Sequence, residues 1–155
     1  MALVLTRQDL PVLDRKEYAP AEELYRGAYI LSDAPDARPE LILIASGSEV
    51  NLIINAAKKL KESKIAVRLV SMPSWELFEE QTPEYRESVL PASVHARIAV
   101  EAGTGQGWER YTGARGLFIG VEKFGSSAPG ELMMREYGLT VDNICKKAMS
   151  LLDKK

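Results

Sequence analysis

The sequence predicts an α/β fold, namely a single three-layer domain with a mixed, mostly parallel sheet of about five strands. Three observations lead to this prediction. Residues 41–45 form an apolar run without polar alternation, which is typical of a strand buried on both faces. An amphipathic helical pattern follows at once, and residues 65–70 then form a second β-rich run. Strand, turn, helix and strand make a βαβ unit, whose crossover should be right-handed.

The turn into the helix reads Ser46-Gly47-Ser48-Glu49. Ser46 with Glu49 three residues later predicts a capping box, in which each side chain satisfies a backbone N–H at the start of a helix. The helix ends in a lysine-rich turn, which suits the negative end of its dipole. Its apolar residues share one face at helical spacing: Val50, Ile53, Ile54, Ala57 and Leu60.

The sequence before this unit gives weaker signals. Residues 2–6 are apolar and predict a short strand, and the charged stretch 14–23 predicts a connecting segment. Residues 27–32 predict another strand. Because residues 33–39 are rich in turn-forming residues, we expect this strand to pair in antiparallel with the strand that starts at residue 41.

The sequence after the unit carries clear helix starts. Ser74, Thr82 and Thr140 are favourable N-cap residues, and each precedes a helical stretch. The predicted elements are helices at 75–78, 83–89, 107–111, 129–137 and 141–152 and strands at 96–102 and 117–121. The predicted core positions are Ile42, Ile44, Ile53, Ile54, Leu60, Val67, Leu69, Ile98, Val100 and Ile119.

Composition limits the classes of function. A net charge of −2 gives no reason to expect nucleic acid or an anionic membrane as a partner. No apolar run reaches membrane-spanning length, and no signal peptide is visible. Cys145 is the only cysteine and His95 the only histidine, so an internal disulfide and a typical structural zinc site are both excluded. We therefore expect a cytoplasmic protein.

Ligands of open α/β sheets bind outside the carboxyl ends of the strands, so the turns there are the candidate sites. The turn at 46–49 could hold an anion at the helix N-terminus, but the charge of Glu49 occupies the same end of the dipole. The glycine-rich stretch 103–107 imitates a phosphate loop without the lysine and Ser/Thr that would complete it. It is either a ligand loop or a tight turn or interface.

Two further groups of residues leave alternatives open. Glu101 and Glu122 follow neighbouring strands and could share acid and base roles, or each could pair with a nearby cation among Arg110, Arg115 and Lys123. A group of aromatic residues lies in the connections and suits either an interface or core packing. These are Trp75, Phe78, Trp108 and Tyr111. His95 precedes a strand and is expected at the surface.

Four motifs in order resemble the C-terminal domain of transketolase: SGSEV at 46–50, SMPSWELFE at 71–79, EAGTGQGWERYTG at 101–113 and EKFGSSAPGELMMREYGLT at 122–140. TRQDLP at 6–11 resembles the end of the preceding, pyrimidine-binding domain of that family. The resemblance spans roughly residues 3–152. It departs from the family at residues 104–106, where bulkier apolar residues are common.

The resemblance implies a transferase of the pentose phosphate pathway that moves a two-carbon ketol unit between sugar phosphates, using thiamine diphosphate and a divalent cation (Mg²⁺ or Ca²⁺). It implies that residues 1–20 are a tail from the preceding domain with a linker and that residues 21–155 are the C-terminal domain. The family holds its catalytic, cofactor and metal residues in the N-terminal and pyrimidine-binding domains, so we expect none of them here. The isolated chain should be structural, should support a homodimer and should be inactive alone.

One substrate residue is carried over from the family. The arginine of its S/T-R-Q motif binds the sugar phosphate, and that residue is Arg7 in this chain. Two other functions remain open: a non-catalytic regulatory module that binds an anion or a nucleotide at the 46–49 turn, and a free-standing regulatory or partner-binding subunit. The upstream coding sequence would separate the last of these from a domain of a longer enzyme.

Overall fold

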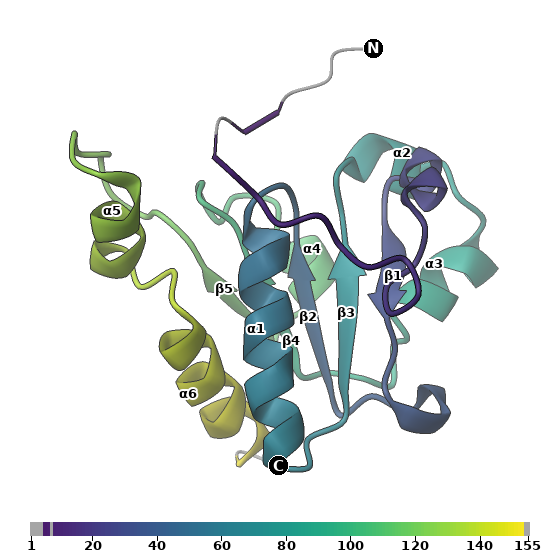
Figure 1. Ribbon diagram of the computed structural model, residues 1–155. Coiled ribbons are helices and arrows are strands. Elements are labelled where there is room, and N and C mark those ends of the chain that lie inside the picture. The colour runs from purple at the N-terminus through teal and green to yellow at the C-terminus, as the bar shows by residue number, and fades with distance from the viewer. Residues whose placement is uncertain (1–4, 7, 154–155) are drawn as a thin grey trace.

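The computed structural model describes residues 5–6 and 8–153 and contains a five-stranded sheet with the order β1-β3-β2-β4-β5 (Figure 1). Strands β2 to β5 run parallel, and β1 lies antiparallel to β3 at one edge. The predicted mixed, mostly parallel sheet is therefore confirmed. The strands are β1 (Tyr29–Ser32), β2 (Leu41–Ala45), β3 (Val67–Ser71), β4 (Arg97–Val100) and β5 (Leu117–Ile119).

The expected pairing of the first two strands is wrong. Strand β2 lies at the centre of the sheet, where Ile44 stands opposite Val70 of β3 on one side and Ala99 of β4 on the other. No edge of β2 is left for β1, which pairs with β3 instead. The connection, which includes the short 3₁₀ helix η2 (Pro35–Ala37), carries the chain past β3 to the centre of the sheet.

Helices cover both faces of the sheet (Figure 1). Helices α1 (Glu49–Glu62) and α6 (Val141–Leu152) pack on one face and against each other. The opposite face carries α2 (Trp75–Glu79), α3 (Pro83–Val89) and α4 (Glu109–Thr112), and the remaining helices are η1 (Ala21–Arg26) and α5 (Gly130–Glu136). In the part of the chain that the structure describes, no helix is long and apolar enough to cross a membrane.

The core is divided by the sheet into two clusters. Because side chains alternate along a strand, Leu41 and Leu43 of β2 join the cluster under α1 and α6, whereas Ile42 and Ile44 join the cluster under α2, α3 and α4. All ten predicted core positions are buried. Because both faces of the central strands are buried, their sequences are continuous apolar runs rather than alternating apolar and polar residues.

Three of the predicted helix caps are confirmed. The hydroxyl of Ser74 accepts a hydrogen bond from the backbone N–H of Leu77, and Thr82 does the same for α3. Thr140 accepts from the N–H of Asn143 at the start of α6. Each hydroxyl satisfies one of the N–H groups that the first turn of a helix leaves without a partner.

The segment that precedes η1 crosses the outside of the domain, and the last residues of this segment are attached to the domain. Leu5 and Thr6 are not in a strand, and the rest of the strand expected at 2–6 lies outside the described residues. Tyr18 is buried in the cluster under α1, and the N–H of Ala19 donates to the carbonyl of Leu31. Residues 18–19 are thereby attached to the edge strand β1.

A buried ion pair anchors the connection between β1 and β2. The guanidinium of Arg68 on β3 donates to both carboxylate oxygens of Asp33, at 2.8 and 2.9 Å. It also donates to the carbonyls of Ser88 and Val89 at the end of α3. One side chain therefore holds two loops at the same edge of the sheet, and its planar fork of donors is what permits all four bonds.

Candidate functional site

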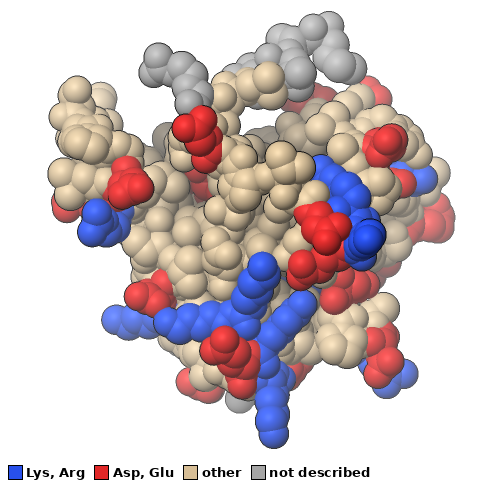
Figure 2. Space-filling view, in the orientation of Figure 1, with Lys and Arg blue, Asp and Glu red and all other residues tan. Residues whose placement is uncertain are grey.

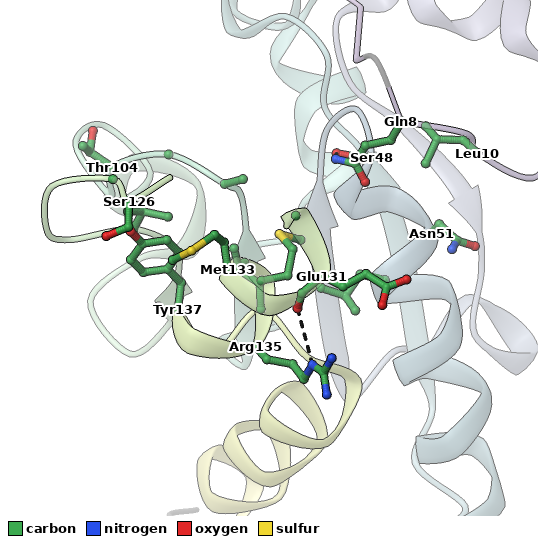
Figure 3. A pocket seen from close by; sticks show the side chains of 18 of the residues that line it. Gln8, Leu10, Ser48, Asn51, Thr104, Ser126, Glu131, Met133, Arg135 and Tyr137 are labelled. Carbon is green, nitrogen blue, oxygen red and sulfur yellow. Dashed lines mark hydrogen bonds between the residues drawn. The ribbon is translucent and has the colours of Figure 1, made fainter. Parts of the chain in front are cut away.

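The carboxyl edge of the sheet forms the candidate site, because the turns after β2, β4 and β5 meet there. Together with residues 8–10 and helix α5 they enclose a groove of about 1190 Å³, which Figure 3 shows from close by. Figure 3 shows Gln8, Ser48 and Asn51 on one side of the groove, and polar as well as methionine side chains on the other: Thr104, Ser126, Tyr137 and Met133. Residues that line the groove include Gln8, Leu10, Ser48, Asn51, Thr104, Ser126, Met133, Arg135 and Tyr137.

A short chain of hydrogen bonds joins the N-terminal segment to helix α1. The side-chain amide of Gln8 donates to the hydroxyl of Ser48 over 3.2 Å, and that hydroxyl donates to the carboxylate of Glu49 over 2.8 Å. Glu49 is only 3% exposed. Figure 3 shows Gln8 beside Ser48 at the rim of the groove. The contact places the backbone next to position 7 against the start of α1.

The capping box expected from Ser46 and Glu49 is wrong. Helix α1 begins at Glu49 after Ser48, and no side chain caps it. The hydroxyl of Ser46 instead donates to the carboxylate of Glu101 over 2.7 Å. The physical reason is strand pairing: Ala45 stands opposite Val100, so the residues that follow them meet across the sheet edge.

Burial and a neighbouring negative charge both shift the pKa of the Glu101 carboxyl group. Burial raises the pKa of its carboxyl group, the Ser46 hydrogen bond opposes that shift, and the negative charge of Glu49 adds to it. Among the described residues Glu101 has no ion pair with an arginine or a lysine, so the expected pairing with a cation is wrong for this residue. Within residues 5–6 and 8–153, this edge therefore carries two carboxylates without a cation paired to Glu101.

Glu122 holds a different loop. Its carboxylate accepts a hydrogen bond of 3.1 Å from the backbone N–H of Gly105, whereas Lys123 pairs with Glu136 over 3.6 Å. In the described part of the chain no hydrogen bond joins Glu101 to Glu122. Each carboxylate fastens a loop, and this arrangement favours a structural role over a shared acid–base role.

The glycine-rich stretch 103–107 is a tight turn packed against aromatic rings. A Cβ atom on Gly105 would lie 2.9 Å from the ring of Phe118, and one on Gly107 would lie 2.7 Å from Trp75. Gly107 also has a φ of +88°, which side-chain-bearing residues rarely adopt. These contacts pack the stretch against the core and favour the tight-turn alternative.

The aromatic residues in the connections belong to the core. Phe78, Trp108 and Tyr111 are almost fully buried in the cluster under α2, α3 and α4, and Trp75 packs against them. Trp75 and Trp108 meet edge to face with ring centroids 5.1 Å apart. Core packing is therefore the correct alternative for this group.

The remaining predicted residues lie apart from the groove or outside the description. Arg7 lies outside the described residues, although Gln8 beside it lines the groove. His95 is exposed, as expected, and Cys145 is half-buried on α6 against α1. Residues 5–6 and 8–153 contain no group of three or more His, Cys, Asp or Glu side chains that could hold a metal ion.

Carboxylates at this edge disfavour an anionic ligand. Because Glu49 and Glu101 occupy the N-terminal end of α1, an anion or a nucleotide phosphate would meet two carboxylates there. The groove offers amides, hydroxyls and apolar side chains, together with the charged side chains of Asp9, Lys123, Glu131 and Arg135. Sequence patterns did not reveal it, because it forms between residues 8–10 and α5, which are more than 100 residues apart.

Comparisons of three kinds with known proteins show which family this chain resembles. A family model described as "Transketolase-like TK C-terminal domain" matches residues 27–140. The transketolase of Geobacillus stearothermophilus is 48% identical over 153 residues, which is 99% of this chain and 23% of that protein. A mutant transketolase (H261F) from Pichia stipitis is similar in structure with a TM-score of 0.83 at 30% identity, covering 95% of this chain and 20% of that one. A transketolase from Leishmania mexicana matches with a TM-score of 0.78 at 40% identity over 86% of this chain and 19% of that one.

Proposed function

Because the chain belongs to the transketolase family and matches its C-terminal domain, we propose that it serves as the C-terminal part of an enzyme that transfers a two-carbon ketol unit between sugar phosphates. The observation that carries this proposal is a match along almost the whole chain to a protein named transketolase. The chain spans about a quarter of the length of that relative. The ketol transfer would require the rest of such an enzyme.

The role of this chain is to support the site rather than to perform the chemistry. Thiamine diphosphate with Mg²⁺ or Ca²⁺ supplies the carbanion chemistry of such an enzyme when it is bound. The described residues do not suit a diphosphate, because the carboxylates of Glu49 and Glu101 occupy the helix end at the sheet edge. The same residues contain no group of three or more His, Cys, Asp or Glu side chains that could hold its metal. We propose that the preceding domains hold the cofactor and the cation.

Residues 1–20 are proposed as the tail of the pyrimidine-binding domain with a linker, and residues 21–155 as the C-terminal domain. Arg7 in that tail is proposed to bind the phosphate of the sugar. Its guanidinium presents two parallel N–H donors that match two phosphate oxygens. The hydrogen bond from Gln8 to Ser48 supports this role, because it holds the residue beside Arg7 against helix α1.

The groove is proposed as a contact surface for the preceding domains or for the second subunit of a cytoplasmic homodimer in the pentose phosphate pathway. Figure 2 shows lysine and arginine side chains gathered over the lower part of this face and a mostly uncharged hollow beside α5. Apolar side chains line this hollow from both sides, Leu10 on one and Met133 of α5 on the other. Exposed apolar groups with a few charged side chains around them, here Asp9, Lys123, Glu131 and Arg135, are typical of an interface with an apolar centre and a polar rim.

A chimera tests this function. The matching segment of the Geobacillus stearothermophilus transketolase is replaced by residues 5–153 of this chain, and ketol transfer is measured with phosphorylated sugars. The proposal expects an active chimera, an inactive truncated enzyme that lacks the segment, and no turnover by the 155-residue chain alone. Ketol transfer by the chain alone, or a folded chimera without activity, would contradict it.

A further inference from the structure

The chain enters the domain through a stretch, residues 5–17, whose described residues make one hydrogen bond to the body of the domain. The side-chain amide of Gln8 donates that bond to the hydroxyl of Ser48 over 3.2 Å. The other hydrogen bonds of these residues stay within the stretch or reach no further than Ala19. The next bond to the domain is donated by the N–H of Ala19 to the carbonyl of Leu31. The outer part of the stretch therefore depends on Gln8.

Packing holds this stretch weakly. Val12 is 97% exposed, and Leu10 is 41% exposed where it lines the groove. Leu13 is half-buried against the cluster under α1 and α6, and the other described residues of the stretch are exposed. A segment with few buried contacts opens locally at a low free-energy cost. The place of the chain around position 8 therefore depends on the bond between Gln8 and Ser48.

Ser48 is a firm support for this bond. Helix α1 begins at the next residue, and the hydroxyl of Ser48 donates to the carboxylate of Glu49 over 2.8 Å. Two residues earlier, Ser46 is tied to Glu101 of the loop after β4 over 2.7 Å. These contacts join Ser48 to the carboxyl edge of the sheet, so the rigid part of the domain determines where Gln8 is held.

The direction of the Ser48 proton makes its oxygen an acceptor for Gln8. A carboxylate accepts hydrogen bonds but donates none, so the single proton of the Ser48 hydroxyl points to Glu49. The lone pairs of the oxygen are then left for an N–H donor, which the amide of Gln8 supplies. Hydrogen bonds linked in this way polarise and strengthen one another.

We propose that Ser48 is a positioning residue that raises the affinity for phosphorylated sugars by holding Gln8, and this inference rests on the role proposed above for Arg7. Consecutive Cα atoms lie about 3.8 Å apart, so an anchor on Gln8 limits the region that the Arg7 side chain reaches. Without the anchor, the guanidinium is in the binding position for a smaller fraction of the time. The apparent affinity for the phosphate then falls by the same factor.

The anchor itself is tested on the 155-residue chain, without ketol transfer. Nitrogen NMR relaxation is measured for the backbone amides of Asp9 and Leu10, which reports their motion on the picosecond to nanosecond scale. Ser48→Ala should make both amides more mobile. Ser48→Thr, which keeps the hydroxyl, should leave their mobility as it is in the wild type. Unchanged mobility in Ser48→Ala would show that Ser48 does not anchor the stretch.

Kinetics of the chimera test the positioning role. Ser48→Ala should raise KM for a phosphorylated acceptor about 2- to 10-fold, the effect of one neutral hydrogen bond, and leave kcat unchanged. A contact made equally in the ground state and the transition state affects KM alone. KM for a free aldose should stay the same, because that sugar has no phosphate to bind. Ser48→Thr should restore the wild-type KM.

Two further variants complete the test. Gln8→Ala combined with Ser48→Ala should raise KM no further than Ser48→Ala alone, because both substitutions remove the same bond. Ser63→Ala is the matched control, since it removes an exposed hydroxyl at the other end of α1 and should leave KM unchanged. Additive losses in the double variant, or an equal rise of KM for the free aldose, would overturn the role of Ser48. A folded wild-type chimera without ketol transfer would instead refute the proposed function, and this inference would fall with it.

Discussion

The hydroxyl of Ser46 donates a 2.7 Å hydrogen bond to the carboxylate of Glu101, which joins the turn after β2 to the loop after β4. Ala45 and Val100, the preceding residues, stand opposite each other in the parallel ladder. A side chain that would otherwise cap helix α1 thus holds two strand ends together. The carboxyl edge of the sheet depends on this bond and on the protonation state of Glu101.

Glu101→Gln should stabilise the domain at neutral pH. Burial raises the pKa of the Glu101 carboxyl above its ordinary value of 4.5. A carboxyl with a raised pKa contributes stability below its unfolded pKa and loses that contribution as the pH rises through the folded pKa. The neutral amide still accepts from Ser46. Urea unfolding from pH 4 to pH 8 should show a gain for the variant that grows with pH, and a gain that is largest at acidic pH would contradict this.

Asp33→Ala should destabilise the domain by about 3 kcal/mol, because it leaves the buried guanidinium of Arg68 without its carboxylate. The side chain of Arg68 is 5% exposed, so its charge would remain buried without its carboxylate partner. Asp142→Ala is the matched control, since it removes a carboxylate from the exposed pair with Lys59 and should change stability little. Denaturant unfolding compares the two, and equal effects would show that burial does not govern these pairs.

Gly27→Ala should destabilise the domain far more than Gly113→Ala. Both glycines have a positive φ, +78° and +73°, outside the ordinary left-handed region, so both substitutions strain the backbone by about 1–3 kcal/mol. A Cβ at Gly27 would also lie 2.3 Å from the backbone nitrogen of Phe78, whereas a Cβ at Gly113 meets nothing within 4 Å. The difference between the two melting temperatures measures the clash. Equal melting temperatures would mean that η1 shifts away from α2 without cost.

Local signals in the sequence predicted most of the elements correctly, because they depend on neighbours within one turn or one strand. In the caps of α2, α3 and α6, a hydroxyl accepts a hydrogen bond from a backbone N–H three residues later. The central strands rest on unbroken apolar runs. Both kinds of signal are complete within a few residues, so they do not require knowledge of the rest of the chain.

The errors arose where a distant residue competes with a near one. Ser46 has a local partner in Glu49 and a distant one in Glu101, and only the strand pairing decides between them. The edge strand β1 could pair with either neighbour until β2 is known to be central. The glycines at 105 and 107 suit a phosphate loop as well as a tight turn, and only the rings of Phe118 and Trp75 distinguish the two.

Arg7→Ala in the active chimera should lower kcat/KM for a phosphorylated acceptor about 10- to 150-fold, because charge-assisted hydrogen bonds contribute roughly 1.5–3 kcal/mol each. An unphosphorylated sugar makes no such contact, so its kcat/KM should fall little. Arg7→Lys should restore only part of the loss, because an ammonium is a point charge rather than a planar fork. Kinetics with phosphorylated and free aldoses, set side by side for each variant, supply the measurement.

The hydrogen bond from Gln8 to Ser48 offers a control in the same segment, since Gln8→Ala loosens the attachment to α1 while it keeps the guanidinium. If Arg7→Ala lowered kcat/KM equally for the phosphorylated and the free sugar, Arg7 would hold the segment in place rather than bind the phosphate.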